Sequence, residues 1–144
     1  MKNATISVAE SCTGGNLSAI LTSKSGSSSY FNSGFITYSN DAKRSMLGVN
    51  LATINMFGAV SEQTAKEMVI GVIDNSSSDI GVAITGIAGP TGGSDTKPVG
   101  MVCFGFCIFG SCFSATKYFK GDRQEVVNNS VNFVIDRLVY ELSK

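Results

Sequence analysis

The sequence has 144 residues, of which 43% are hydrophobic and 15% charged, and its formal net charge is zero. This length and composition indicate a single globular domain, residues 1–144, with enough apolar side chains for a core. A balanced charge without a basic stripe argues against nucleic-acid binding through phosphate contacts. No apolar run reaches the roughly 18 residues of a membrane span, and no secretory leader precedes Glu10, so we expect a cytoplasmic protein with no membrane partner.

The complete lack of histidine narrows the possible chemistry. It excludes the Ser-His-Asp and Cys-His nucleophile systems and histidine-ligated zinc sites. Any acid–base catalysis must therefore use lysine, tyrosine, cysteine or a carboxylate.

Strands and helices alternate through the first part of the chain. Apolar runs and periodicity predict a buried strand over Ala4–Ala9, a helix from Asn16 to about Ser23, and a strand over Gly34–Ser39. Asn40 is typical of a helix N-cap, and two short helices are expected at 41–47 and 51–57.

The second half continues this alternation and then changes. Ser61 is the expected N-cap of a longer helix with an apolar stripe of Ala65, Met68, Val69 and Val72. A strand over Asp79–Thr85 follows, and strands at 99–109 and 111–119, joined at Gly110, form an antiparallel hairpin. Asp122 and Glu125 form the capping box of the last helix. This order predicts an α/β fold, a three-layer α/β/α sandwich on a mixed, mostly parallel sheet.

Three of the four cysteines lie in or beside the predicted hairpin, where a free cysteine behaves as a small hydrophobe. Cys103 and Cys107 share one strand and stand about 13 Å apart at the usual rise, too far for a disulfide or a shared metal ion. We therefore expect Cys103, Cys107 and Cys112 to pack as free side chains in the core.

The first of three unusual turns runs from Glu10 to Gly15, directly after the first strand. It presents Ser11, Cys12 and Thr13, and its glycines, Gly14 and Gly15, open a helix whose N–H groups suit an oxyanion. An ordinary serine or threonine helix cap has the same pattern. Both Ser11 and Cys12 are candidate nucleophiles, and Ser11 is favoured because no thiolate partner lies near Cys12 in the sequence.

The second turn joins Tyr38 to the helix that holds Lys43. With Asn40 as N-cap, Lys43 occupies the third helical position, where the helix dipole disfavours the ammonium form and lowers the lysine pKa. A general-base lysine requires such a lowered pKa. The competing interpretation is an exposed lysine in water.

The third turn follows the strand that ends at Thr85, and it is rich in glycine from Gly86 to Gly93. Its backbone amides suit a phosphate or a ribose, although it lacks the ending of a P-loop. Arg123 follows a helix cap, where the dipole disfavours a cation, and this indicates an anionic ligand nearby. A plain surface loop and a solvated arginine are the alternatives.

Seven stretches together resemble one family, and they occur here in a single order: Ala9–Gly15, Gly34–Lys43, Leu47–Val49, Gly58–Glu62, Thr85–Pro90, Lys97–Gly100 and Gly121–Arg123. The sequence is similar, from about residue 4 to 142, to the C-terminal domain of the competence/damage-inducible CinA proteins, the nicotinamide-nucleotide amidohydrolase (NMN deamidase, PncC-type) family. The resemblance implies a mixed five-stranded sheet, a homodimer, and hydrolysis of nicotinamide mononucleotide to nicotinate mononucleotide and ammonia in NAD salvage.

The resemblance also implies the catalytic residues Ser11, Tyr38 and Lys43, with no metal or redox cofactor. We expect Lys43 to deprotonate Ser11 and Tyr38 to relay or orient that proton. The expected substrate-binding residues are Cys12, Thr13, Gly14, Gly15, Thr85, Gly86, Ala88, Gly89 and Arg123. Two other functions stay open: a non-catalytic nucleotide-binding or competence-associated protein, and an amidase for another small carboxamide.

Overall fold

The computed structural model describes residues 3–144. Its elements, in chain order, are β1 (Ile6–Glu10), α1 (Asn16–Leu21), the 3-10 turn η1 (Ser27–Ser29), β2 (Phe31–Ile36), α2 (Asn40–Leu47), α3 (Leu51–Phe57), α4 (Glu62–Ser76), β3 (Ile80–Gly86), β4 (Met101–Ile108), β5 (Ser111–Tyr118) and α5 (Arg123–Leu142). Among these residues, no helix is long and apolar enough to cross a membrane.

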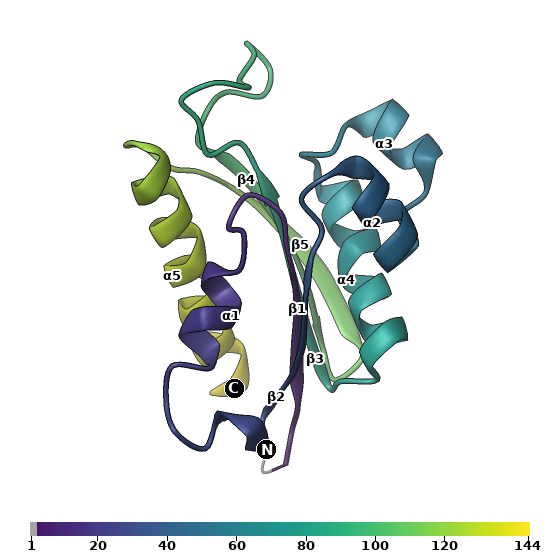
Figure 1. Cartoon of the computed structure of the whole chain (residues 1–144), viewed down its shortest axis with the longest axis vertical. Helices are drawn as coiled ribbons and strands as arrows, with labels where there is room; N and C mark the ends of the chain where they lie inside the picture. Colours follow the sequence, from purple (N-terminus) through teal and green to yellow (C-terminus); the bar gives the residue numbers. More distant parts are fainter. Residues whose placement is uncertain (1–2) are drawn as a thin grey trace.

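One sheet of five strands, in the order β2-β1-β3-β4-β5, forms the middle layer. β1 pairs in parallel with β2 and β3, whereas β4 runs antiparallel to both of its neighbours, so four of the five strands point the same way. Helices α1 and α5 cover one face, and α2, α3 and α4 cover the other (Figure 1). The predicted three-layer sandwich on a mixed, mostly parallel sheet is confirmed.

The core forms on both faces because the three central strands, β1, β3 and β4, are buried on both sides along almost their whole length. On one face Val8, Val82 and Phe104 pack with Val131 and Val134 of α5. On the other face the predicted stripe of α4 packs against the small side chains of β1 and β3; this second cluster contains Ala9, Ala83, Met68, Val69 and Val72.

Helix caps agree with the sequence at two positions and differ at a third. Ser61 accepts a hydrogen bond from the Thr64 N–H, and Asp122 and Glu125 form both bonds of a capping box. The prediction of Asn40 as N-cap was wrong, because Ser39 caps α2 and Asn40 is already helical. Both residue types are good caps, and the chain reaches the helical conformation one residue earlier than expected.

Strand β2 ends at Ile36, three residues before the predicted end at Ser39. The Thr37 N–H still bonds to the Glu10 carbonyl, at 2.9 Å, and the chain then leaves the sheet toward α2. This early departure frees the carbonyl groups of Thr37 and Tyr38 from the sheet, and they are used at the site described below.

The predicted hairpin is confirmed, but the prediction for two of its cysteines was wrong. Phe109 and Gly110 form a two-residue turn with φ of 48° and 85°, which sets Cys107 directly opposite Cys112. These two cysteines form a disulfide, whereas Cys103 is free and buried as expected. Spacing along one strand does not reveal a pair that forms only across the turn.

Candidate active site

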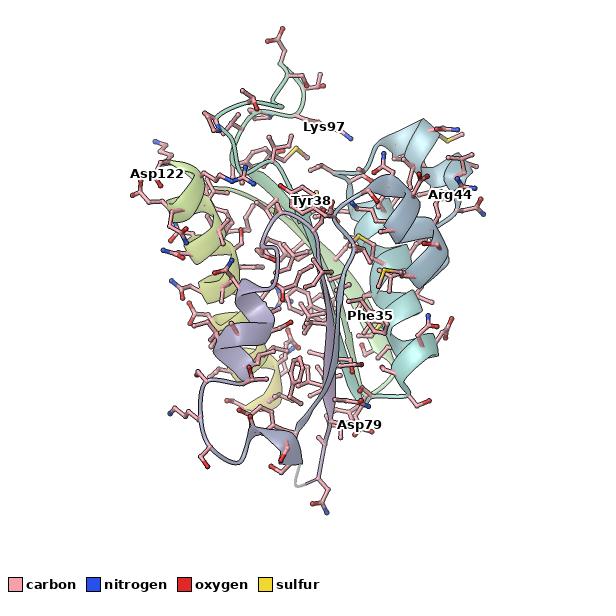
Figure 2. All side chains as sticks on the ribbon, in the orientation of Figure 1. Phe35, Tyr38, Arg44, Asp79, Lys97 and Asp122 are labelled. Carbon is pink, nitrogen blue, oxygen red and sulfur yellow. A yellow bond between two sulfur atoms is a disulfide. The ribbon has the colours of Figure 1, made fainter. Side chains whose placement is uncertain are left out.

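A pocket of about 320 Å³ opens at the carboxyl ends of β1, β2 and β3. Its lining includes residues of α2 and the first residue of α5, and both helices begin near the upper edge of the sheet, on opposite faces (Figure 1). Figure 2 shows Tyr38 at this edge, below the long loop that carries Lys97 and beside the start of α5 at Asp122.

The pocket brings together nine of the twelve predicted site residues: Ser11, Cys12, Tyr38, Lys43, Thr85, Gly86, Ala88, Gly89 and Arg123. Thr13, Gly14 and Gly15 are not part of its lining. Six further residues line it: Asn40, Ala59 and Val60, which the sequence did not single out for the site, and Ile87, Thr91 and Gly92 of the glycine-rich loop.

Ser11 is the first residue after β1, and main-chain bonds on both sides fix its position. Its N–H donates to the Ile84 carbonyl of β3 at 3.0 Å, and its carbonyl accepts from the Gly14 N–H. The side chain is buried, with 7% of its surface exposed, yet it borders the pocket. The hydroxyl is therefore held in place where a small ligand can reach it.

Lys43 also lines the pocket, and its side chain is buried, with 1% of its surface exposed. Its Nζ lies 3.1 Å from Ser11 Oγ, and it donates to the carbonyl oxygens of Thr37 at 3.1 Å and Tyr38 at 3.4 Å. Within residues 3–144, no carboxylate forms an ion pair with this amine. The lysine therefore reaches Ser11 without a compensating negative charge.

Burial lowers the pKa of Lys43 below its ordinary value of 10.5. The pKa of Lys43 is thus lowered, as predicted, but the cause is burial and not the helix dipole that the sequence suggested. Because Ser39 is the cap, Lys43 is the fourth helical residue, and its side chain points into the core of the site. Removal of the ammonium from water is the dominant effect.

Cys12 also borders the pocket, but its thiol is a poor nucleophile. Burial raises its pKa to about 12, despite the opposing effects of its own backbone N–H, Lys43 and Arg123. At neutral pH the group is therefore protonated, and the thiolate, the form that attacks carbonyl carbons, is scarce.

The Tyr38 side chain lies away from the serine and the lysine. It is 59% exposed, and its hydroxyl accepts a hydrogen bond from Arg123 at 2.9 Å. Arg123 also donates to the Gly89 carbonyl at 2.7 Å, so it joins two of the pocket-forming turns. Only the main-chain carbonyl of Tyr38, 3.4 Å from Ser11 Oγ, contacts the nucleophile. The structure thus places the phenol with Arg123 and not between Ser11 and Lys43.

The glycine-rich loop after β3 forms the opposite wall of the pocket. A Cβ at Gly86 would lie 2.9 Å from the Met101 carbonyl oxygen, and Gly89 has a φ of +83°, so both positions suit glycine. The Thr85 hydroxyl donates to the Ala59 carbonyl, which ties this wall to the start of α4. Within residues 3–144, the N–H groups of Ala88 and Gly89 have no protein acceptor. They are available to a ligand.

The turn after β1 differs from the expectation that amides from Cys12 to Gly15 face a ligand. The Gly14 N–H bonds to the Ser11 carbonyl, and the Gly15 N–H bonds to Glu10 Oε1 at 3.2 Å. The Thr13 hydroxyl donates to the same Glu10 oxygen at 2.6 Å. Glu10, whose role as an acceptor no sequence pattern indicated, takes the place expected for an external anion.

Comparison with known proteins agrees with this fold. The model of the CinA C-terminal domain family matches residues 1–142. The chain is 44% identical to the nicotinamide-nucleotide amidohydrolase PncC of Enterobacter agglomerans, covering 96% of this chain and 85% of that protein. It is 48% identical to a CinA-like protein of Leptospira biflexa, covering 97% of this chain but only 34% of that longer protein.

Solved structures of similar sequence have the same fold. The competence damage-inducible protein A from Klebsiella pneumoniae superposes with a TM-score of 0.94 at 35% identity, over 98% of this chain and 88% of that chain. The chain spans about a third of the length of the curated relatives matched most fully, such as one from Clostridium perfringens (35%). By sequence and by structure, the chain belongs to the CinA C-terminal domain family.

Proposed function

We propose that this protein hydrolyses the carboxamide of nicotinamide mononucleotide to nicotinate mononucleotide and ammonia, through an acyl ester on Ser11. The contact that carries the proposal is the one between Lys43 Nζ and Ser11 Oγ, a buried pair at 3.1 Å. The amidohydrolase name of the Enterobacter relative, which matches nearly the whole chain, supports the substrate.

The neutral form of Lys43 suits the contacts around it. A neutral amine has two N–H groups and one lone pair, and the carbonyl oxygens of Thr37 and Tyr38 accept the two N–H bonds. The lone pair is then directed at the hydroxyl of Ser11. In this state Lys43 is a general base in hydrogen-bond reach of the proton that it removes.

In the reaction, Ser11 Oγ bonds to the carboxamide carbon while its proton passes to Lys43 Nζ. The tetrahedral intermediate then collapses: the C–N bond breaks, and Lys43 returns the proton to the departing nitrogen, which leaves as ammonia. Water attacks the resulting ester with Lys43 again as base. The carboxylate product leaves as Ser11 regains its proton.

Hydrogen-bond donors stabilise the two negative charges of the reacting nucleotide, the oxyanion and the phosphate. The free N–H group of Cys12, next to the nucleophile in the pocket wall, stabilises the oxyanion. The phosphate meets Arg123 and the free N–H groups of Ala88 and Gly89 on the opposite wall. Tyr38, held by Arg123, contacts the nucleotide and does not transfer the proton of Ser11.

The direct test is ammonia release from nicotinamide mononucleotide by the purified protein, with nicotinamide riboside as the matched substrate that lacks the phosphate. We expect turnover of the nucleotide and a much lower kcat/KM for the riboside. Tight nucleotide binding without ammonia release would contradict the proposal and favour a non-catalytic nucleotide-binding protein. An equal kcat/KM for both substrates would contradict the proposed phosphate site.

The pH dependence of the reaction follows from the state of Lys43. Only its neutral form accepts the proton of Ser11, so kcat/KM should rise with pH as the lysine loses its proton. Because burial lowers the lysine pKa, this rise should have its midpoint below 10.5. Initial rates over about pH 5 to 10 measure it. A rate that falls with increasing pH throughout this range would exclude a neutral-lysine base.

Replacement of Arg123 tests the phosphate site. We expect Arg123→Met to lower kcat/KM for nicotinamide mononucleotide about 10- to 100-fold, mostly through KM, since one charge-assisted bond to the phosphate is lost. The variant should leave turnover of nicotinamide riboside almost unchanged. Arg137→Met, which removes an arginine paired with Glu141 further along the same helix, is the matched control. An equal loss with both substrates would place Arg123 outside the phosphate site.

A further inference from the structure

Glu10 is the last residue of β1 and directly precedes the nucleophile. Its side chain is fully buried, and its carboxylate accepts five hydrogen bonds from the turn and helix that follow Ser11. The donors are the Thr13 hydroxyl and the Gly15 and Leu17 N–H groups on Oε1, and the N–H and hydroxyl of Ser18 on Oε2, at 2.6 to 3.2 Å. No cation contributes to this set.

These bonds determine which amides of the turn remain free. The N–H groups of Ser11 and Gly14 bond to main-chain carbonyls, and those of Gly15, Leu17 and Ser18 bond to Glu10. Between Ser11 and Gly14, the N–H groups of Cys12 and Thr13 have no acceptor within residues 3–144. Of these two residues, only Cys12 borders the pocket, so its N–H is the unused donor of the turn that a ligand beside Ser11 can reach.

We propose that Glu10 is a positioning residue: it anchors the Ser11–Gly15 turn to the start of α1 so that the Cys12 amide, which borders the pocket, stays directed at the oxyanion. This inference rests on the proposed function, since it assigns that amide to the tetrahedral intermediate. Glu10 does not touch the substrate. It acts through the turn that it holds.

Three of the five partners are main-chain N–H groups, which can only donate, and each oxygen of Glu10 accepts from at least one of them: Gly15 and Leu17 on Oε1, and Ser18 on Oε2. In Glu10→Gln the amide oxygen replaces one carboxylate oxygen, but the amide nitrogen is itself a donor. On either side it would face at least one main-chain N–H group, and two donors make no bond. The turn should then lose its fixed geometry although the side-chain volume is unchanged.

The kinetic test compares Glu10→Gln with Glu67→Gln. Glu67 also holds a helix start, accepting from the Asn50 N–H at 2.8 Å and from Thr53, but it lies outside the pocket. We expect Glu10→Gln to lower kcat about 100-fold with KM within about twofold, the loss typical of a misplaced oxyanion donor. Glu67→Gln should lower Tm but leave kcat per folded molecule unchanged. An equal kcat for both variants would reduce Glu10 to a structural role.

A second measurement does not depend on amide hydrolysis. Pyridine-3-boronic acid should bond through boron to Ser11 Oγ, the hydroxyl proton passing to Lys43, and give an anionic tetrahedral adduct that boron-11 NMR detects. We expect this adduct in the native protein, none in Ser11→Ala, and at least about tenfold weaker binding in Glu10→Gln.

Ser18→Ala removes only one bond to Glu10, so it serves as the milder variant if Glu10→Gln does not fold. We expect it to bind the boronic acid about threefold more weakly than the native protein. Native affinity in both variants, or no adduct in the native protein, would overturn the positioning role. Ammonia release by the native protein judges the proposed function separately, because the boronate needs no scissile amide.

Discussion

Replacement of Lys43 by methionine is expected to lower kcat for nicotinamide mononucleotide by at least about 10³-fold at pH 7, since the base in contact with Ser11 Oγ is lost. Methionine keeps a similar length and fills the same buried volume, so the pocket should keep its shape. Ammonia release at saturating substrate measures the effect. The matched control is Lys66→Met, an exposed lysine of α4 that lies outside the pocket.

The same variant has a stability signature that a merely misfolded protein would lack. Burial lowers the Lys43 pKa in the folded state only, so between that lowered pKa and 10.5 the unfolded chain binds one proton more than the folded chain. The free energy of unfolding of the native protein should therefore rise with pH over this interval. Lys43→Met should lack that rise.

For the kinetic test, a loss in kcat of less than tenfold in Lys43→Met would contradict the role of Lys43 as the base and indicate that it only contacts the substrate.

Replacement of Ser11 by alanine is expected to have the largest effect of any single change, a loss in kcat of at least about 10⁴-fold, as with other covalent nucleophiles. Cys12→Ala should stay within about threefold of the native protein, because burial raises the thiol pKa to about 12 and keeps it protonated. The two residues are neighbours in the same turn, so each variant is the other's control.

Rates for both variants, corrected for the folded fraction by circular dichroism, decide between the two nucleophiles. The reverse pattern, with Cys12→Ala inactive and Ser11→Ala active, would transfer the covalent role to the thiol. Loss of activity in both would indicate that the turn tolerates no change, and the boronate adduct would then identify the attacking atom.

Local sequence patterns predicted most of the helices and strands. The apolar runs of β1 and β3, the stripe of α4 and the caps Ser61 and Asp122 depend on neighbours within a few residues, and each was predicted correctly. The three turns meet in one pocket because the carboxyl ends of adjacent parallel strands lie at one edge of the sheet. The family resemblance implied the pairing of Ser11 with Lys43, which are 32 residues apart in the sequence and have their side-chain atoms 3.1 Å apart.

What the sequence could not predict depends on tertiary contacts. Ser39 and Asn40 are adjacent and both are good caps, so only the observed path of the chain chooses between them. Cys107 meets Cys112 through the register of the hairpin. The Tyr38 phenol turns to Arg123, 85 residues away, and Glu10 acquires five donors only when the turn folds back over it. None of these contacts has a signal in spacing or composition.

The acyl ester on Ser11 is the central claim, and product partitioning with hydroxylamine tests it most directly. A covalent ester is open to any small nucleophile, so hydroxylamine added to the reaction should divert part of the product from nicotinate mononucleotide to the corresponding hydroxamate. The hydroxamate share should grow with hydroxylamine concentration while ammonia release continues. Nicotinate mononucleotide as the sole product at every hydroxylamine concentration would contradict the ester and indicate direct attack by water.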